Sequence, residues 1–532
     1  MVPSHSAGFR TSVLDAMSEG HLYAGRMSEV PEEAARLLEG VGARRLRHAL
    51  TLLTDDRSWD ADALVRATAA PRRAVDALLA ALGDDLEDGR IRRDRVAAYR
   101  PLAAPAIIAD PVAHLLPKHA DAVAEMAALI AAAPRARTAL DHVAATADTA
   151  VRRALLLGAR FWLGSARLLC VGDHDLTSLA VALTHPGVEI TVVDIDDRIL
   201  EFIGAEAARR GLPIRCRFAD LRLGLPPGAR EWADLVFTDP PYTPEGVALF
   251  TRRGLEGLRD HDSGRVLVAY GASEGTPALA LKVQEAIGPL HLAYEAIWPD
   301  FNRYDGAPAI GSASDLYVLR PTSRTWKTLG STTAGTRIYT QGPQAVEAPE
   351  RPLEAAAEPA DLLVGDWPKG FAPGTPRVHL ATWLAKPYAG RTGDVVIALP
   401  AGYDALLPRV LLASRAERVR VLTPATLPRS LKGVLAAVYH LKTAPGEIVA
   451  SRVEPPGGTG AVLRHILDRP HGRVANSWRE GLIRHAAGDL TKNQARARIQ
   501  EAAPWLGDAT VLDLPAHRLA DLPDAVRRTL TP

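Results

Sequence analysis

Cysteine and net charge are both scarce in this 532-residue sequence. Its two cysteines, Cys170 and Cys216, are too few for a disulfide framework or a cysteine-based zinc site, which fits a reducing cytosol. The 63 basic and 62 acidic residues leave a net charge of +1, which excludes a dedicated nucleic-acid coat and a strongly acidic tail. No apolar run approaches the roughly 20 residues of a membrane helix, and the N-terminus lacks a signal-peptide pattern. We therefore expect a cytoplasmic protein without a membrane anchor.

The composition is otherwise that of a globular protein, with 47% hydrophobic residues. At roughly 100–200 residues per domain, the length predicts about three or four domains. Composition and periodicity divide the chain into a partly disordered N-terminus, a winged-helix module, a Rossmann-like α/β domain, a Pro- and Ala-rich linker, and a second α/β domain. The corresponding ranges are 1–30, 31–115, 116–325, 326–375 and 376–532.

The N-terminal module combines helices with a short hairpin, a combination that suggests a winged helix. Asp60 is placed to cap one helix, Pro71 suits the first turn of the next, and Gly89 sits at the hairpin turn. Five arginines could contact DNA phosphates: Arg72, Arg73, Arg90, Arg92 and Arg93. The acids beside them would oppose DNA: Asp84, Asp85, Glu87 and Asp88. A docking or dimerisation domain is therefore favoured over nucleic-acid binding.

Apolar strands alternate with helices in the central domain, which predicts a parallel, doubly wound sheet. Strands are expected at 166–172, 188–196, 214–221, 233–242, 264–271 and 314–321. Helices are expected at 176–183, 198–210, 244–258 and 277–287. Sheets of this kind bind ligands beyond the carboxyl ends of their strands.

Acidic residues follow four of these strands and are expected to converge on one crevice. They are Asp173 and Asp175 after the first, Asp194 after the second, Asp220 after the third and Asp239 after the fourth. We expect a locally anionic pocket here, with the arginines spread over many surfaces. For Asp173 and Asp175, capping of the following helix is the alternative interpretation.

The turn after the first strand has one glycine, Gly172, where a dinucleotide site needs several. Asp173 and Asp175 would repel a pyrophosphate, which argues against NAD, FAD and ATP. Asp194 lies about 20 residues after this turn, where an acid accepts both ribose hydroxyls. A ribose ligand with a positive charge fits better, and S-adenosylmethionine or its decarboxylated form meets both demands. Asp220 could accept the adenine amino group.

The sequence Asp-Pro-Pro-Tyr ends the fourth strand at residues 239–242. Its two prolines fix the backbone, so that Asp239 and Tyr242 can hold an amine. A turn without chemistry is the alternative. Among the histidines only His174 lies in a motif, and no spacing typical of a metal site occurs. We therefore expect neither a metal nor a tightly bound cofactor.

The runs VGDHDLTSLAVAL, VVDIDDRILEFI, FTDPPYTPEGVALFTRRG and SDLYVLRPT occur in this order. With them, residues 31–325 resemble the branched-chain polyamine synthases, the N4-bis(aminopropyl)spermidine synthases of thermophiles, which also carry an N-terminal winged helix. The resemblance implies transfer of aminopropyl groups from decarboxylated S-adenosylmethionine to a spermidine-like polyamine, releasing methylthioadenosine. It does not cover residues 326–532.

The resemblance also assigns roles to individual residues. The family's first motif reads GDDD where this chain has GDHD, so His174 replaces an acid and the acceptor can differ. Catalytic roles are implied for Asp175, Asp239 and Tyr242. Donor-binding roles fall to Gly172, Asp173, Asp194 and Asp220, and amine-binding roles to Asp173, Asp175, Asp239 and Tyr242.

Two other functions remain open at this stage. One is an S-adenosylmethionine-dependent N-methyltransferase of the DPPY type, and the other is a non-catalytic regulator that senses a nucleoside or polyamine. In the C-terminal part, GDVVIALPAGYDALL resembles SARLLCVGDHDLTSLA in its strand, turn and helix order, so a degenerate duplicate and an unrelated domain are both open. That domain could be a dimerisation platform, giving a homodimer, or a lid, or a second activity.

Overall fold

The computed structural model describes residues 30–104, 110–272, 275–329, 337–346, 360–368, 370–390, 392–458, 460–487 and 489–530. The chain divides into two compact units. The first comprises Met1–His114, Gly271–Ala280 and Trp298–Asp315, and the second comprises Leu115–Tyr270, Leu281–Ile297 and Leu316–Pro532. The second unit therefore contains most of the central domain together with the whole C-terminal domain.

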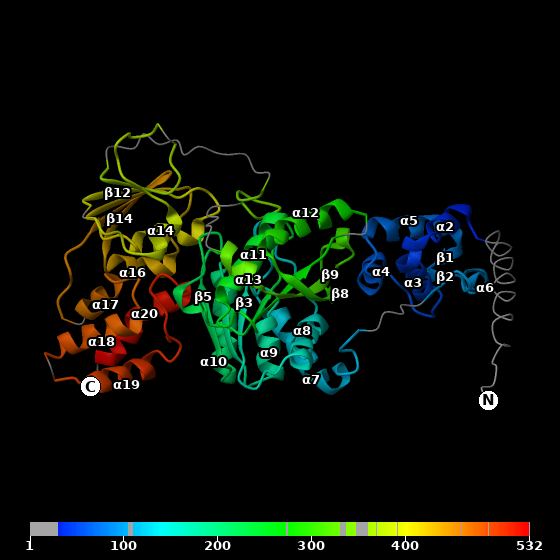
Figure 1. Ribbon diagram of the computed structural model, residues 1–532, viewed down its shortest axis with the longest axis horizontal. Helices are drawn as coiled ribbons and strands as arrows, with labels where there is room; N and C mark the ends of the chain where they lie inside the picture. Colours follow the sequence, from blue (N-terminus) through cyan, green and yellow to red (C-terminus); the bar gives the residue numbers. More distant parts are fainter. Residues whose placement is uncertain are drawn as a thin grey trace, which may run out of the picture. The chain divides into compact units, whose positions relative to one another are not determined.

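Short helices and a two-stranded hairpin form the N-terminal part of the first unit (Figure 1). The Asp60 carboxylate accepts a hydrogen bond from the Ala63 amide at 2.6 Å, which confirms the predicted N-cap. Pro71 is itself the N-cap residue of the next helix, one position before the expected first turn. Gly89 has a φ of +71° between the paired strands. The elements are α2 (Glu32–Leu37), α3 (Arg44–Leu53), α4 (Ala61–Thr68), α5 (Arg72–Leu82), β1 (Leu86–Glu87), β2 (Arg90–Ile91) and α6 (Val96–Tyr99).

A seven-stranded sheet forms the centre of the molecule's α/β domain, in the order β5-β4-β3-β6-β7-β9-β8. Its strands are β3 (Arg167–Val171), β4 (Glu189–Asp194), β5 (Ile214–Phe218), β6 (Leu235–Thr238), β7 (Arg265–Tyr270), β8 (Ala293–Arg303) and β9 (Ala313–Arg320). The pairs from β5 through β7 are parallel, as predicted for a doubly wound α/β fold. The strand order reverses at β3, so ligands are expected beyond the carboxyl ends of β3 and β6.

Helices connect these strands and pack against the sheet and one another (Figure 1). They are α7 (Ala120–Ala132), α8 (Ala147–Arg160), α9 (Thr177–Thr184), α10 (Asp197–Arg210), α11 (Pro244–Gly257), α12 (Pro277–Ile287) and α13 (Ser323–Thr328). Contacts join α8 to α9, α10 to β4 and β5, and α11 to β3, β6 and β7. The four helices predicted between the strands are confirmed, with ends that differ by one residue at most.

The strand β8 was not predicted from the sequence. Its segment contains Pro299, which lacks the amide hydrogen that a central strand needs. Because β8 is the last strand of the sheet, one of its edges has no partner strand, and proline is tolerated at such an edge.

A second sheet forms the C-terminal domain, in the order β11-β10-β12-β13-β15-β14. Its strands are β10 (Leu362–Val364), β11 (Arg377–Val378), β12 (Asp394–Ala398), β13 (Arg418–Leu422), β14 (Tyr439–Ala444) and β15 (Glu447–Arg452). The helices are α14 (Leu380–Ala385), α15 (Leu407–Leu412), α16 (Lys432–Ala436), α17 (Gly460–Leu467), α18 (Val474–His485), α19 (Lys492–Ala502) and α20 (Ala516–Leu530). Strand β12, α15 and the parallel strand β13 repeat the strand–helix–strand order of β3, α9 and β4. The antiparallel strands β15 and β14 complete a sheet of different order.

Two parts of the expected linker belong to folded structure. Strand β10 lies within 326–375 and pairs with β12. Residues 337–346 pack on the central domain, where the Thr243 hydroxyl donates to the Ile338 carbonyl at 2.7 Å and the Thr340 amide donates to Asp141 at 2.7 Å. Ile338 and Tyr339 are both buried. The linker predicted at 326–375 from its Pro, Ala and Glu content is therefore too long at both ends.

Among the residues that the structure describes, no helix combines the length and the apolar character that a membrane crossing requires.

Candidate functional site

The turn after β3 brings Asp173 and Asp194 together. Gly172 has a φ of +72°, a conformation that favours glycine, and it directs the chain back toward the end of β4. The Asp173 amide donates to Asp194 Oδ2 at 2.9 Å, and the Asp196 amide donates to Asp194 Oδ1 at 2.8 Å. The Asp173 carboxylate in turn accepts from the Ser178 amide at 3.1 Å, so Asp173 also caps the first turn of α9. The capping interpretation is thus confirmed for Asp173, which also lies where the nucleoside site is expected.

Both of these carboxyl groups are buried, and burial disfavours their charged forms. Burial raises the pKa of Asp173 to about 7, and the nearby charges of Asp175 and Asp194 act in the same direction. Burial likewise raises the pKa of Asp194 to about 6. Each group therefore changes charge near neutral pH, where a cationic ligand would favour the ionised form.

A pH dependence of stability follows from the raised pKa of Asp173. Between about pH 4 and 7 the unfolded chain has lost this proton while the native chain retains it, so the native state binds more protons. The free energy of unfolding is therefore expected to fall as pH rises through this window, by on the order of a few kcal/mol. Urea unfolding of wild type and Asp173→Asn at pH 5 and 7.5 tests this. The variant should lose less stability than wild type, and equal losses would contradict the expectation.

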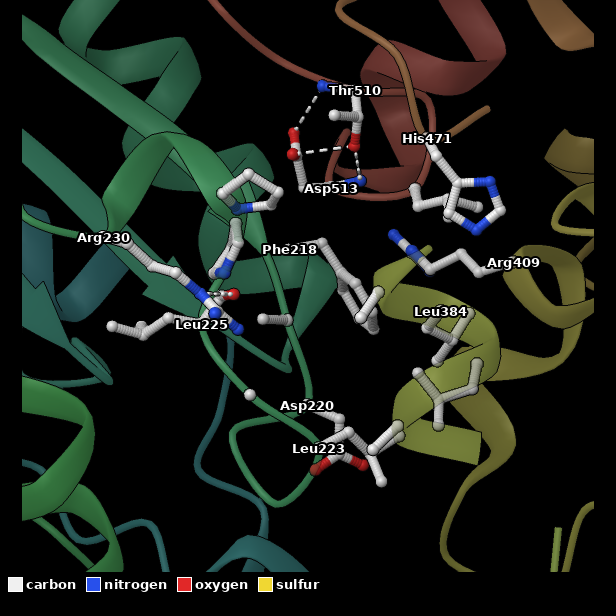
Figure 2. Close-up of a pocket in the computed structure, with 18 residues that line it drawn as sticks. Phe218, Asp220, Leu223, Leu225, Arg230, Leu384, Arg409, His471, Thr510 and Asp513 are labelled. Atoms are coloured by element: carbon white, nitrogen blue, oxygen red, sulfur yellow. Dashed lines mark hydrogen bonds between the residues drawn. The ribbon is translucent and has the colours of Figure 1, made fainter. Parts of the chain in front are cut away.

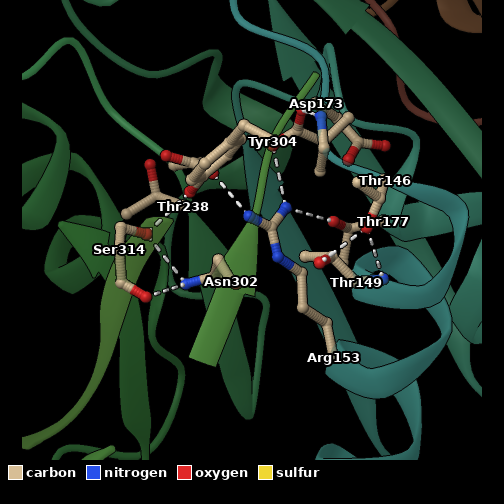
Figure 3. A network of polar contacts seen from close by, with 12 residues as sticks. Thr146, Thr149, Arg153, Asp173, Thr177, Thr238, Asn302, Tyr304 and Ser314 are labelled. Atoms are coloured by element: carbon tan, nitrogen blue, oxygen red, sulfur yellow. Dashed lines mark hydrogen bonds and ion pairs between the residues drawn. The ribbon is translucent and has the colours of Figure 1, made fainter. Parts of the chain in front are cut away.

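Asp175 and Asp239 meet at one buried arginine, Arg153 of α8. The Arg153 Nη1 atom donates to Asp175 Oδ2 at 2.8 Å and to the Thr177 hydroxyl at 3.1 Å, while Nη2 donates to Asp239 Oδ2 at 2.5 Å. Figure 3 shows the Arg153 side chain extending from its helix toward Thr177. The second Asp175 oxygen accepts from the Ala145 amide at 2.8 Å. Asp175 thus joins the two strand ends and does not cap α9.

The guanidinium determines the charge state of this pair. Burial acts to raise the pKa of Asp175, but the charge and hydrogen bond of Arg153 outweigh burial, and the net shift is downward. Arg153 itself has no exposed side-chain surface and lies 4.8 Å from the centre of the Phe237 ring. Asp239 is the more accessible of the two acids, with 16% of its side chain exposed against 7% for Asp175.

Sequence reasoning missed Arg153, although one signal was present. Ala150, Ala154 and Leu157 are buried on the same face of α8, so an arginine between them interrupts an apolar stripe. A charged residue at such a position is almost never buried unless it is paired. The pattern therefore pointed to a buried carboxylate partner.

Two buried arginines lie among the acids that were expected to form a locally anionic pocket. Arg153 neutralises Asp175 and Asp239, and Arg222 pairs with Asp220 at 2.5 Å. Arg222 lies only two positions from Asp220, whereas Arg153 lies 22 and 86 positions from its two acids. The crevice is thus less anionic than five acids in one place suggested.

Tyr242 lies in the turn that follows β6. Its hydroxyl donates to Asp239 Oδ1 at 3.1 Å. Its ring meets the buried Tyr270 ring edge to face, with centroids 5.4 Å apart. Such a packed aromatic pair fixes a ring beside the carboxylate, as recognition of an amine requires.

His174 stacks on His142, with ring centroids 4.2 Å apart and an angle of 15° between the planes. Burial, then the neighbouring His174, lowers the pKa of His142 to about 3, and burial also lowers the pKa of His174. Both rings are therefore neutral at physiological pH. The acid expected in this motif from the family resemblance is replaced by an uncharged aromatic surface.

Asp220 lies apart from the Arg153 cluster, at the boundary with the C-terminal domain. It lines a cavity of about 190 Å³ whose other walls come from both domains (Figure 2). Leu223 and Leu225 contribute from the segment after β5, and Leu384 and Arg409 contribute from the C-terminal helices α14 and α15. The boundary is therefore built from side chains of both domains.

Polar contacts join the two domains around this cavity. The Phe218 amide donates to the Asp513 carbonyl at 2.8 Å, and Arg409 pairs with Asp197 of α10 at 3.1 Å. Arg409 is fully buried and lies 3.2 Å from the centre of the Phe218 ring. Because these groups are buried and paired, the C-terminal domain is part of the same packed unit as the site.

Within the described residues, no group of three or more His, Cys, Asp or Glu side chains is arranged to hold a metal ion.

Comparison with known proteins identifies the central segment. Residues 121–348 match the family model described as the branched-chain polyamine synthase A C-terminal domain. An uncharacterised protein of Methanocaldococcus jannaschii is 38% identical over 209 residues, which are 39% of this chain and 51% of the relative. An N(4)-bis(aminopropyl)spermidine synthase of Thermococcus kodakarensis is 37% identical over 120 residues, which are 22% of this chain and 34% of the relative. The matches thus span about half the length of the first relative and about a third of the second.

Solved structures were compared as well. The branched-chain polyamine synthase of Thermus thermophilus, in complex with N4-aminopropylspermidine and 5′-methylthioadenosine, aligns with a TM-score of 0.41 and 22% identity, over 60% of this chain and 98% of that chain. A third relative, the N(4)-bis(aminopropyl)spermidine synthase of Thermus thermophilus, is 41% identical over 91 residues, 17% of this chain and 26% of the relative. Residues 121–348 are thus similar to the C-terminal domain of the branched-chain polyamine synthases.

Proposed function

We propose that the protein is an aminopropyltransferase that moves the aminopropyl group of decarboxylated S-adenosylmethionine to a nitrogen of a polyamine. The observation that carries the proposal is the meeting of Asp175 and Asp239, from two strand ends, at a single buried arginine beside Tyr242. Two relatives that match 22% and 17% of the chain at 37% and 41% identity are named N(4)-bis(aminopropyl)spermidine synthase, which supports the same reaction class.

In the proposed reaction, the acceptor nitrogen attacks the methylene carbon beside the sulfonium. A carbon–nitrogen bond forms, the carbon–sulfur bond breaks, and its electron pair leaves with neutral methylthioadenosine. The attacking amine must first be deprotonated, since free aliphatic amines titrate near about 10, as lysine does. We assign the proton acceptor to Asp239, because its side chain is the more exposed of the two acids, at 16% against 7%, and because the pKa of Asp175 is lowered.

The remaining residues are assigned to binding. Gly172, Asp173 and Asp194 would hold the ribose and the charged part of the donor, and Asp220 would accept from the adenine amino group. The raised pKa of Asp173 supports this role, because a cationic donor favours the ionised carboxylate. Tyr242 would position the amine by packing its ring beside Asp239.

A donor assay tests the proposed function. Purified protein is incubated with spermidine, spermine or putrescine and with either decarboxylated S-adenosylmethionine or S-adenosylmethionine, and products are identified by mass spectrometry. We expect methylthioadenosine and an acceptor heavier by one or more aminopropyl groups, formed only with the decarboxylated donor. The donor should also bind more tightly without its carboxylate, because a carboxylate-lined site repels that group. S-adenosylhomocysteine as the product would instead identify a methyltransferase and overturn the proposal.

We propose further that the N-terminal helices and hairpin are a winged helix used for docking or dimerisation. Two of the five arginines that could contact phosphates are paired with acids: Arg72 pairs with Asp62 at 2.5 Å and with Asp76 at 2.8 Å, and Arg92 pairs with Asp94 at 2.8 Å. These pairs lower the positive charge that the unit can offer to DNA. They support a protein partner, such as a second copy of the chain, over nucleic acid.

A further inference from the structure

One loop of the C-terminal domain, Ala401–Tyr403, follows β12 and contacts the candidate nucleoside site. The Gly402 carbonyl accepts a hydrogen bond from Arg222 Nη2 at 2.8 Å. The Tyr403 ring lies against the same guanidinium, whose carbon is 3.9 Å from the ring centre. This loop therefore holds an arginine that belongs to the central domain.

Arg222 in turn fixes Asp220. Its Nε atom donates to Asp220 Oδ1 at 2.8 Å and its Nη2 atom donates to Oδ2 at 2.5 Å, so the two planar groups meet edge to edge. The Arg222 backbone amide adds a third hydrogen bond, to Oδ1, at 3.0 Å. Tyr339 lies near the guanidinium on the side of the central domain, at 5.7 Å. The orientation of Asp220 is thus set by the arginine that the C-terminal loop holds.

The loop conformation depends on Gly402. Its φ is +83°, which favours glycine, and a Cβ atom there would lie 2.5 Å from Cγ of Gln344. The Gln344 side chain donates to the Ala401 carbonyl at 2.8 Å, which anchors the loop on the central domain. The carbonyl of Gly402 is therefore presented to Arg222 by a backbone that other residues would strain.

One nitrogen of the Arg222 guanidinium can still donate hydrogen bonds. Its Nη1 atom is buried and has no hydrogen-bond partner among the residues that the structure describes, and the side chain has no exposed surface. Nε and Nη2 of this guanidinium are bonded, so Nη1 is the donor that remains for a further acceptor. A carboxylate oxygen accepts about two hydrogen bonds, so Asp220 Oδ2 can take one more donor.

We propose that the Ala401–Tyr403 loop completes an adenine subsite by fixing Arg222, so that Asp220 and Arg222 together recognise the base. Adenine presents an amino group, which would donate to Asp220, next to a ring nitrogen, which would accept from Arg222 Nη1. Hypoxanthine has a carbonyl group in place of the amino group and would face the Asp220 carboxylate with an acceptor. This inference rests on the proposed use of an adenosine-derived donor, and it gives the C-terminal domain a role in donor recognition.

Direct binding of the reaction product tests the subsite without requiring turnover. Calorimetric titration of 5′-methylthioadenosine into the full chain compares wild type with Tyr403→Leu. The matched control is Tyr439→Leu, since Tyr439 is also buried in the C-terminal domain and lies 5.9 Å from an arginine, Arg452, but donates only to carbonyls of its own domain. We expect at least tenfold weaker binding for Tyr403→Leu and less than threefold change for Tyr439→Leu. Unchanged binding for Tyr403→Leu, or equal weakening in both variants, would overturn the inference.

The inosine counterpart, 5′-methylthioinosine, supplies a readout that general destabilisation would not change. Wild type should prefer methylthioadenosine by at least tenfold, because a site built to pair an amino group rejects an analogue that lacks it. Tyr403→Leu should reduce this preference, and an equal preference in both proteins would overturn the inference.

Nucleoside binding without aminopropyl transfer would overturn the proposed function alone. Transfer with no preference for adenine would overturn the subsite alone, and absence of all nucleoside binding would overturn both.

Discussion

Asp239→Asn is expected to reduce aminopropyl transfer by about a thousandfold while the fold persists, because an amide cannot accept the proton of the attacking amine. The substitution preserves the shape of the side chain and an oxygen for the Arg153 hydrogen bond, which measures 2.5 Å in the native protein. The measurement is the rate of methylthioadenosine release at saturating donor and acceptor.

Tyr242→Phe provides the matched comparison for this prediction. It removes the hydroxyl that donates to Asp239 at 3.1 Å but retains the ring that packs on Tyr270. We expect a much smaller loss than for Asp239→Asn, since the proton acceptor remains. A rate for Asp239→Asn within tenfold of wild type would exclude Asp239 as the acceptor and point to solvent or to Asp175.

Arg153→Met should produce the largest loss of stability, about 3–5 kcal/mol, because it leaves two neighbouring carboxylates, Asp175 and Asp239, without their shared cation. Removing the guanidinium also removes the cause of the lowered pKa of Asp175, which should then rise. The measurement is the free energy of unfolding from urea titrations of the full chain at neutral pH.

Arg160→Gln is the control on the same helix. Arg160 pairs with Glu295 at 3.5 Å and has 31% of its side chain exposed, so its loss should cost no more than about 1 kcal/mol. At low pH, where Asp175 and Asp239 are protonated, the penalty of Arg153→Met should shrink because no buried anion remains. A penalty independent of pH would show that packing, and not charge, explains the effect.

The central sheet could be predicted from the sequence because its strands are short apolar runs and its helices begin at recognisable caps. Thr243 illustrates the point: its hydroxyl accepts from the Gly246 amide at the start of α11, immediately after the DPPY turn. The edge strand β8 escaped prediction because Pro299 and the mixed polarity around it do not fit the pattern of a buried strand.

The acids of the candidate site could be foreseen, but the long-range contacts of their arginine partners could not. Each acid follows a strand, and the fold rule that gathers strand ends depends only on order along the chain. Arg153 reaches Asp239 across 86 positions, and Arg222 meets Gly402 across 180, so local patterns carry no information on these contacts. The net charge of the crevice could therefore be determined only from the three-dimensional structure.

The packed segment 337–346 determines where the central domain can be separated from the rest of the chain. A shortened protein ending near residue 330, where composition suggests a linker, would remove Tyr339 from its place beside Arg222 and Ile338 from its contact with Thr243. Loss of activity in such a protein would then be mistaken for a requirement for the C-terminal domain. Ending the chain after residue 346 retains both contacts, so only this boundary separates the contribution of the C-terminal domain from damage to the domain that precedes it.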